Sequence, residues 1–159
     1  QTIHYNITVE GELTEHKACQ LADLKLAHVA HKVSFFQGDA CNLKADFSGY
    51  DFILAANLID RLHHPQAFLN DIHSRLNIGG VLMLTSPYTW LTQHTERSEW
   101  IGGFKKDAEK FSTLDGLKLL LAPHFELIQA PTDIEFVIRE TKRKFQHSLS
   151  QVTLWRRKV

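Results

Sequence analysis

The stretch from residue 50 to residue 85 constrains the fold more tightly than any other part of the chain. Tyr50–Ala56 and Val81–Thr85 are short, nearly continuous apolar runs, which are typical of strands covered on both faces. Between them, Pro65 suits the first position of a helix with one apolar face, and the Asn-Ile-Gly-Gly run at 77–80 is expected to end it. Strand, helix and strand joined by short links predict a right-handed crossover and a parallel sheet, so the expected fold class is α/β.

Further elements are expected before this unit. Ile3–Val9 alternates between apolar and polar residues and predicts a strand. Thr14 is expected to cap a helix with Leu21 and Leu24 on one face. Val33–Gln37 is a compact apolar run, which we interpret as another core strand.

After the central unit, the irregular stretch Tyr88–Phe111 is too long for an ordinary connection and is typical of a lid. Thr113 is expected to cap a helix over Leu114–Leu121. Strand-like runs follow at Phe125–Gln129, Ile134–Arg139 and Ser148–Trp155, which predict a C-terminal antiparallel hairpin before a solvated basic tail, Arg156–Lys158. The sequence shows no linker or repeat, so one domain over residues 1–159 is predicted.

Charge and composition exclude several classes of protein. Eighteen Lys and Arg residues balance eighteen Asp and Glu residues, which argues against nucleic acid and anionic membranes as partners. No apolar run approaches the roughly 20 residues that span a bilayer. Two cysteines and no signal peptide indicate a reducing compartment, and we expect a cytoplasmic protein.

Polar side chains follow three of the expected strands. Asp39 comes after the first core strand, Asn57 after the second, and Ser86-Pro87-Tyr88 after the third. Ligands of open parallel sheets bind beyond the carboxyl ends of the strands, so these residues are candidates for a binding site. Spacing alone leaves open that Asp39 and Asn57 only cap the turns that follow.

Several segments together resemble one enzyme family. Gly38-Asp39-Ala40, the run 50–54 and the run 76–85 are similar to the second half of a class I S-adenosylmethionine (SAM) methyltransferase. The longer stretches 55–62, 84–90 and 136–147 resemble the mercaptohistidine N-methyltransferase domain of ovothiol biosynthesis, which is usually fused behind a 5-histidylcysteine sulfoxide synthase. The resemblance covers nearly the whole chain from about Gly11 onward.

The resemblance implies a Rossmann-like sheet, SAM as cofactor and thiohistidine as the small-molecule substrate. Asp39 resembles the residue that contacts the adenine of SAM, with Ala40 beside it, and Asn57 and Leu58 resemble residues on the methionine side. The family's first strand and glycine-rich loop are expected before residue 1, since none of the eight glycines forms such a loop. Binding of SAM by this chain alone is therefore a separate question from the function of the protein.

The resemblance also suggests direct displacement, in which a ring nitrogen of the substrate imidazole takes the methyl group. Tyr88, His94 and His147 are candidate hydrogen-bonding partners of the ring, and Arg139 could pair with the substrate carboxylate. Trp90 could contact the substrate from the lid. Each residue has a plainer alternative: core or satellite-core packing for the two aromatic residues, solvent exposure for the histidines, and a surface ion pair for the arginine.

Other chemistries are less well supported. Ten histidines invite a metal hypothesis, but no carboxylate or cysteine stands at a matching spacing, so no metal is predicted. Ser86 lacks a nucleophile elbow, and Cys41 lacks an obvious base. A second class of function is a non-catalytic or truncated module that binds a partner or a second copy through the edge of the strand Tyr50–Ala56. A nucleotide-binding domain of another enzyme class is a third, less favoured reading.

Overall fold

The computed structural model describes residues 2–159, which form two compact units. The first unit comprises the N-terminal residues up to Gln37 together with Phe136–Ser148, and the second comprises Gly38–Glu135 together with Leu149–Val159. The prediction of a single domain over residues 1–159 stays a prediction.

A β-hairpin dominates the first unit. Strand β1 (Thr2–Glu10) pairs antiparallel with β2 (Leu13–Gln20), and the 3-10 helix η1 (Ala27–Lys32) follows. The predicted first strand is thus confirmed, but the helix expected from Thr14 is wrong. Local helix propensity in this segment is overridden by the backbone hydrogen bonds that β1 offers.

The segment Val33–Gln37 is the second correction to the predicted elements. It adopts no regular secondary structure, and Phe35 and Phe36 are exposed. An apolar, strand-like sequence becomes a strand only when another strand accepts its hydrogen bonds, and this segment pairs with no strand among residues 2–159.

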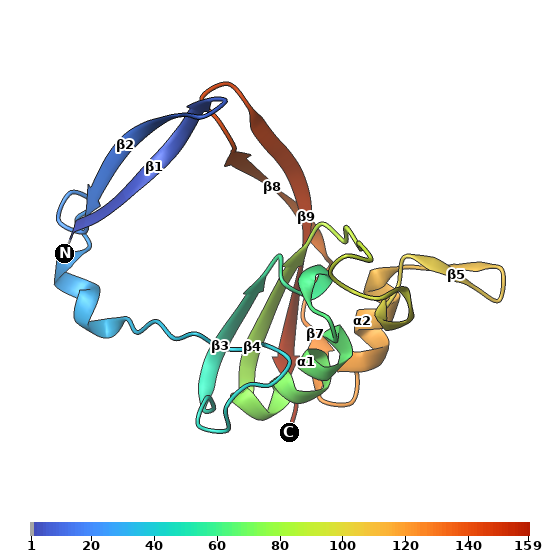
Figure 1. Cartoon of the computed structure of the whole chain (residues 1–159). Coiled ribbons are helices and arrows are strands. Elements are labelled where there is room, and N and C mark those ends of the chain that lie inside the picture. The colour runs from blue at the N-terminus through green and yellow to red at the C-terminus, as the bar shows by residue number, and fades with distance from the viewer. Residues whose placement is uncertain (1) are drawn as a thin grey trace. The chain divides into compact units, whose positions relative to one another are not determined.

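The second unit is built on a mixed sheet in the order β3-β4-β9-β7 (Figure 1). Strands β3 (Tyr50–Ala56) and β4 (Leu76–Ser86) are parallel, whereas β9 (Phe145–Arg157) runs antiparallel to β4 and to β7 (Phe125–Leu127). Strand β8 (Thr132–Arg139) pairs with β9 off this path. The predicted parallel pair and the α/β fold class are confirmed.

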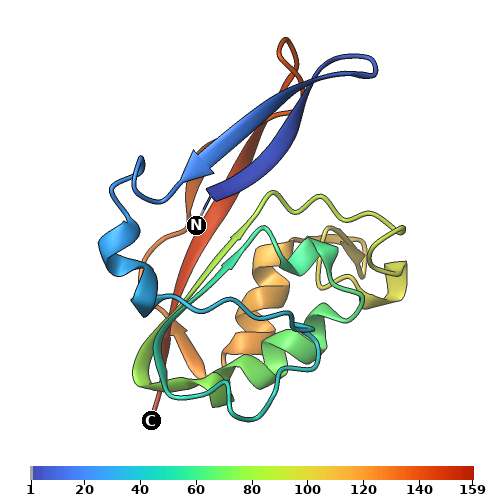
Figure 2. The same cartoon turned by 60° about the vertical axis from the view of Figure 1, so that its left-hand side comes forward.

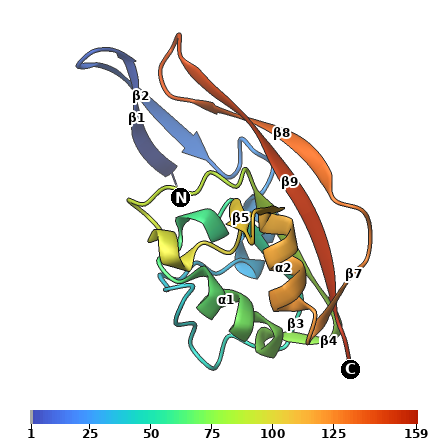
Figure 3. The same cartoon turned by 90° about the vertical axis from the view of Figure 1, so that its right-hand side faces the viewer.

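Two short helices cover one face of this sheet (Figure 2). Helix α1 (Pro65–Asp71) begins with the expected proline but ends earlier than predicted, in the 3-10 turn η3 (Ile72–Arg75). Helix α2 (Thr113–Leu121) lies beside α1 (Figure 3). Its N-cap is Ser112 rather than the expected Thr113, and the Ser112 and Asp115 side chains form a capping box.

The link from η3 into β4 explains why the helix ends early. Strand β4 starts at Leu76, opposite Tyr50, and the next pair is Val81 opposite Phe52. The run 77–80 that was expected to end the helix is therefore an irregularity inside the parallel pair, and Gly79 adopts the positive φ of 82° that glycine tolerates.

The C-terminal strands are longer or shorter than expected by a few residues, and the basic tail is only partly solvated. Arg157 belongs to β9, and its guanidinium donates a hydrogen bond to the carbonyl oxygen of Leu76. The expected lid region contains the 3-10 turn η4 (Arg97–Glu99) and a small hairpin of β5 (Phe104–Lys106) and β6 (Glu109–Phe111).

The hydrophobic core of the second unit lies between the sheet and the two helices. Fully buried apolar side chains come from every layer: Ile59, Leu69, Ile72, Leu76, Leu82, Leu84, Leu117 and Leu121. Each such side chain contributes about 1.5–3 kcal/mol through removal from water. Among residues 2–159, no helix combines the length and the apolar character needed to cross a bilayer.

The contact between α2 and the preceding loop yields a stability prediction. A Cβ atom added at Gly116 would overlap the carbonyl oxygen of Ile101, and backbone cannot move aside cheaply. We expect Gly116→Ala to lower the free energy of unfolding by about 1–3 kcal/mol in urea titrations, despite the better helix propensity of alanine. Gly38→Ala is the control, because nothing lies within 4 Å of its added Cβ. Equal stability of the two variants would contradict the prediction.

Candidate functional site

Polar residues gather at the carboxyl ends of the two parallel strands. We call this region the rim and define it as residues 57–61, which follow β3, and residues 86–89, which begin with the last residue of β4. The parallel register pairs Ala56 with Thr85, so the two segments leave the sheet side by side. This arrangement confirms that the chain after β3 and the chain after β4 meet at one edge.

Asn57 joins three strands at the rim. Its backbone N–H donates to the carbonyl oxygen of Thr85 at 2.8 Å and to Thr85 Oγ1 at 3.1 Å. Its Oδ1 accepts from Thr85 Oγ1 at 3.2 Å and from Ser150 Oγ at 2.7 Å, so the amide ties β3 to β4 and β9. The φ of 50° at Asn57 is one that asparagine tolerates better than most residues. Its role toward a cofactor stays a prediction.

A buried carboxylate, which the sequence reasoning missed, organises the other half of the rim. Asp60 is only 1% exposed. Its Oδ1 accepts from Ser86 Oγ at 2.9 Å, and its Oδ2 accepts from Thr89 N at 3.1 Å, from Thr89 Oγ1 at 2.9 Å and from Arg61 Nη1 at 2.8 Å. Arg61 also donates to Thr89 Oγ1 and to the Thr89 carbonyl oxygen. The available sequence signal was the charged pair Asp60-Arg61 set between the apolar residues Ile59 and Leu62.

Tyr88 lies within this network with a strained backbone. Its φ is +54°, a conformation that costs a residue other than glycine about 1–2 kcal/mol. Its N–H donates to Ser86 Oγ at 3.0 Å, and its hydroxyl donates to Gln151 Oε1 at 3.1 Å. Burial raises the pKa of Tyr88 to about 12, and the negative charges of Asp133 and Asp60 act in the same direction. The phenol is therefore a neutral hydrogen-bonding group at pH 7.

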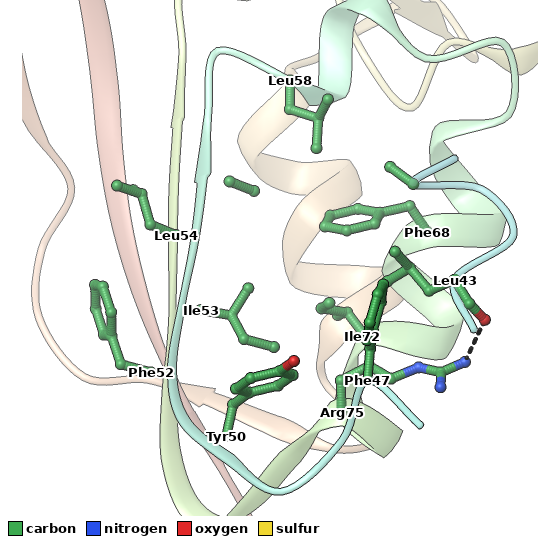
Figure 4. A pocket seen from close by; sticks show the side chains of 12 residues that line it. Leu43, Phe47, Tyr50, Phe52, Ile53, Leu54, Leu58, Phe68, Ile72 and Arg75 are labelled. Atoms are coloured by element: carbon green, nitrogen blue, oxygen red, sulfur yellow. Dashed lines mark hydrogen bonds between the residues drawn. The ribbon is translucent and has the colours of Figure 1, made fainter. Parts of the chain in front are cut away.

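An apolar cavity of about 320 Å³ opens between β3, helix α1 and the loop 40–50 (Figure 4). The predicted cofactor residues Ala40 and Leu58 both line it, together with Ile53 and Phe68. In Figure 4 the Ile53 side chain points toward the helices, while Phe52 points to the other side of the strand. The volume and the apolar lining are those of a small-molecule pocket.

Arg75 closes one side of this cavity and pins the loop to the helix. Its guanidinium donates to Asp71 Oδ2 at 2.7 and 2.9 Å and to the Lys44 carbonyl oxygen at 2.8 Å. It also donates to the Leu43 carbonyl oxygen at 3.2 Å, the contact that Figure 4 marks with a dashed line. These contacts connect the loop that follows Asp39 to η3, so they help to hold the cavity open.

Asp39 is exposed and shapes the turn that leads into the cavity. Its Oδ1 accepts a hydrogen bond from the backbone N–H of Cys41 at 2.9 Å. The turn-capping alternative is thus seen for one carboxylate oxygen. A role of Asp39 in binding adenine stays a prediction.

Trp90 and His94, the predicted site residues in the expected lid, differ in burial. Trp90 is 8% exposed, its Nε1 donates to Thr113 Oγ1 at 2.9 Å, and its ring stacks on Trp100 with centroids 6.1 Å apart. Trp90 belongs to the same buried cluster as Ile59 and Leu117, so it packs in the main core and not in a separate satellite core, and its contact with substrate stays a prediction. His94 is partly buried, and its Nε2 lies 3.0 Å from Gln93 Nε2.

Arg139 and His147 belong to the first unit, and both are exposed. Arg139 Nε donates to the carbonyl oxygen of Thr141 at 3.1 Å, within the turn between β8 and β9. The roles of both residues toward a substrate stay predictions. Among residues 2–159, no group of three or more His, Cys, Asp or Glu side chains is arranged to hold a metal ion.

The pKa of Tyr88 leads to a prediction about alkaline stability. Between pH 10, the ordinary pKa of tyrosine, and about pH 12, the unfolded chain loses the Tyr88 proton while the folded protein keeps it. The unfolded state then binds fewer protons, so the free energy of unfolding falls as the pH rises through this window. Urea titrations from pH 9 to 11.5 should show a steeper fall for the wild type than for Tyr88→Phe. Equal slopes would contradict the assignment.

Comparisons with known proteins support the fold. No protein-family model and no curated protein matches the sequence. Among solved structures, one studied for the conversion of a disulfide bond into a thioacetal group during echinomycin biosynthesis matches with a TM-score of 0.55 at 14% identity, over 85% of this chain. The chain spans 62% of the length of that protein.

Two further solved structures have a similar fold. A SAM-dependent methyltransferase from Methanosarcina mazei matches with a TM-score of 0.50 at 15% identity, over 88% of this chain and 79% of that protein. A protein from Bacillus halodurans, proposed to be a methyltransferase, matches with a TM-score of 0.50 at 14% identity, over 87% and 78% of the two chains. The chain therefore has a Rossmann-like α/β fold of the class I methyltransferase type.

Proposed function

We propose that the protein is a SAM-dependent methyltransferase that methylates an imidazole nitrogen of 5-thiohistidine. The observation that carries the cofactor assignment is the cavity beside β3, because it is lined by both Ala40 and Leu58, two residues that the family resemblance implies as cofactor contacts. The similar fold of a SAM-dependent methyltransferase supports the reaction class. The choice of thiohistidine rests on the sequence resemblance alone.

The residues around the cavity suit the adenosyl part of SAM. An apolar cavity of about 320 Å³ suits the flat face of a purine. Asp39 immediately precedes Ala40, which lines the cavity, and its carboxylate could accept a hydrogen bond from an exocyclic amino group. Asn57 precedes Leu58 in the chain, so its polar amide lies next to a residue of the apolar cavity lining. When bound, SAM supplies a methyl group already activated by the positive charge on sulfur.

The chain's own contribution to such a reaction is positioning. Holding the nucleophilic nitrogen, the methyl carbon and the leaving sulfur in line removes much of the entropic barrier, and no covalent enzyme intermediate is needed. Tyr88, held neutral at pH 7, is proposed to hydrogen-bond the substrate ring. His94 and His147 are further candidates for this contact, Arg139 for the substrate carboxylate, and Trp90 for the apolar side of the ring.

A second candidate function is partner binding through the edge of β3. Within residues 2–159, β3 pairs only with β4, and Phe52 and Leu54 are 54% and 53% exposed. Such an edge can accept a strand from a second copy. Sedimentation of the purified protein distinguishes this function, because a dimer that neither binds SAM nor transfers methyl groups would favour it.

The proposal is tested by calorimetric titration of SAM and by methyl transfer to 5-thiohistidine, with histidine as the comparison substrate. Both assays are run on the 159-residue chain and on any longer product of the same gene. Binding of SAM with transfer to thiohistidine, in either form, is the expected result. Absence of both in every form would overturn the proposal.

Asp39 provides a sharper test of the cofactor site. Asp39→Asn keeps an acceptor for the Cys41 N–H but replaces the second oxygen with a donor, which would oppose an adenine amino group. We expect Asp39→Asn to weaken SAM binding by about 1–3 kcal/mol in the form that binds SAM. Asp46→Asn, an exposed carboxylate of the same loop, is the matched control. An unchanged dissociation constant for Asp39→Asn would remove this residue from the site.

A further inference from the structure

Tyr88 has a backbone conformation that is unusual for its residue type. Among residues 2–159 it is the one aromatic residue with a positive φ. The other non-glycine residues in this region are Asn57, which tolerates the conformation, and exposed turn residues: Lys25, Asp107 and Ala108. Strain of this kind persists only where surrounding contacts impose it, and it is found most often at functional sites.

The contacts that impose the conformation converge on one carboxylate. The N–H of Thr89 donates directly to Asp60 Oδ2 at 3.1 Å. The N–H of Tyr88 donates to Ser86 Oγ at 3.0 Å, and that hydroxyl in turn donates to Asp60 Oδ1 at 2.9 Å. Asp60 therefore holds two successive backbone N–H groups, one directly and one through Ser86.

Stability alone is a poor explanation for this arrangement. Burying a carboxylate requires it to lose its hydration, and an apolar residue of similar volume often stabilises a protein as well as a buried ion pair does. Asp60 is 1% exposed, whereas its partner Arg61 remains 39% exposed, so most of the desolvation falls on the carboxylate. What the carboxylate offers that an apolar residue cannot is a set of directed acceptors for the turn 86–89.

We propose that Asp60 is a positioning residue, whose buried carboxylate holds the turn 86–89 in the strained form that keeps the Tyr88 side chain at the rim. This proposal rests on the proposed function for its catalytic consequence, since Tyr88 then acts on the bound substrate. Its structural half, the control of Tyr88 by Asp60, stands on the contacts within the second unit alone.

The test follows Tyr88 directly. The protein contains three tyrosines, so 3-fluorotyrosine labelling gives three ¹⁹F resonances, and Tyr88→Phe identifies the one that belongs to Tyr88. We expect Asp60→Asn and Ser86→Ala each to shift or broaden the Tyr88 resonance and leave the other two in place. In the active form of the enzyme, kcat should fall at least tenfold, while the dissociation constant for SAM changes less than threefold.

Asp115→Asn is the matched control. Asp115 also accepts hydrogen bonds through its carboxylate, from the N–H and hydroxyl of Ser112, but it caps α2 instead of facing the rim. This variant should lower the melting temperature without moving the Tyr88 resonance or kcat. If Asp60→Asn does not fold, Ser86→Ala decides, because it removes only one hydroxyl.

The outcomes separate the two proposals. A Tyr88 resonance that stays at its wild-type position in both Asp60→Asn and Ser86→Ala would overturn the positioning role. A shifted Tyr88 resonance with an unchanged kcat would show that Asp60 controls Tyr88 without contributing to catalysis, and would overturn the catalytic part of the proposal. If the wild type neither binds SAM nor transfers methyl groups, the proposed function fails, and the fluorine spectra still decide whether Asp60 controls Tyr88.

Discussion

Parallel pairing of β3 with β4 is the constraint on which the rest of the second unit depends. A parallel connection cannot be made by a tight turn, so the chain must cross over one face of the sheet, and α1 with η3 makes that crossing. The same pairing brings the ends of both strands to one edge, which places Asn57 and Ser86 in adjacent positions. The apolar cavity beside β3 also depends on this pairing. Among residues 2–159, β3 pairs only with β4, and the cavity lies beside β3 between the strand, α1 and the loop 40–50.

Favourable and unfavourable contributions to the free energy of folding meet at the rim. A left-handed φ at Tyr88 costs about 1–2 kcal/mol, and desolvation of Asp60 adds a cost of several kcal/mol. The hydrogen bonds to the Asp60 carboxylate act in the opposite direction. Two of them act on the turn 86–89 through Ser86 and the Thr89 N–H, so they select one conformation of that turn.

Prediction from the sequence succeeded where a hydrophobic pattern indicated a locally buried element. It failed where the structure of a segment depended on pairing with a strand elsewhere in the chain. The apolar run at β3 and the proline at the start of α1 gave the correct elements, and β3 has the predicted bounds. Strand β2 was predicted as a helix, and Val33–Gln37 was predicted as a strand, because neither pattern shows which strand is available as a partner. Asp60 was missed because its burial depends on hydroxyl groups of residues 86 and 89, far along the chain.

By itself, the sequence determined the α/β class, the parallel pair and the set of polar residues that follow its strands, because apolar runs, a helix-starting proline and turn residues act through local chemistry. Only the tertiary structure decided that Ala40 and Leu58 share one cavity, that Trp90 packs into the core, and that Asp60 accepts hydrogen bonds from the turn 86–89. These contacts join residues separated by many positions, and their energy depends on which groups the fold brings within hydrogen-bonding or packing distance.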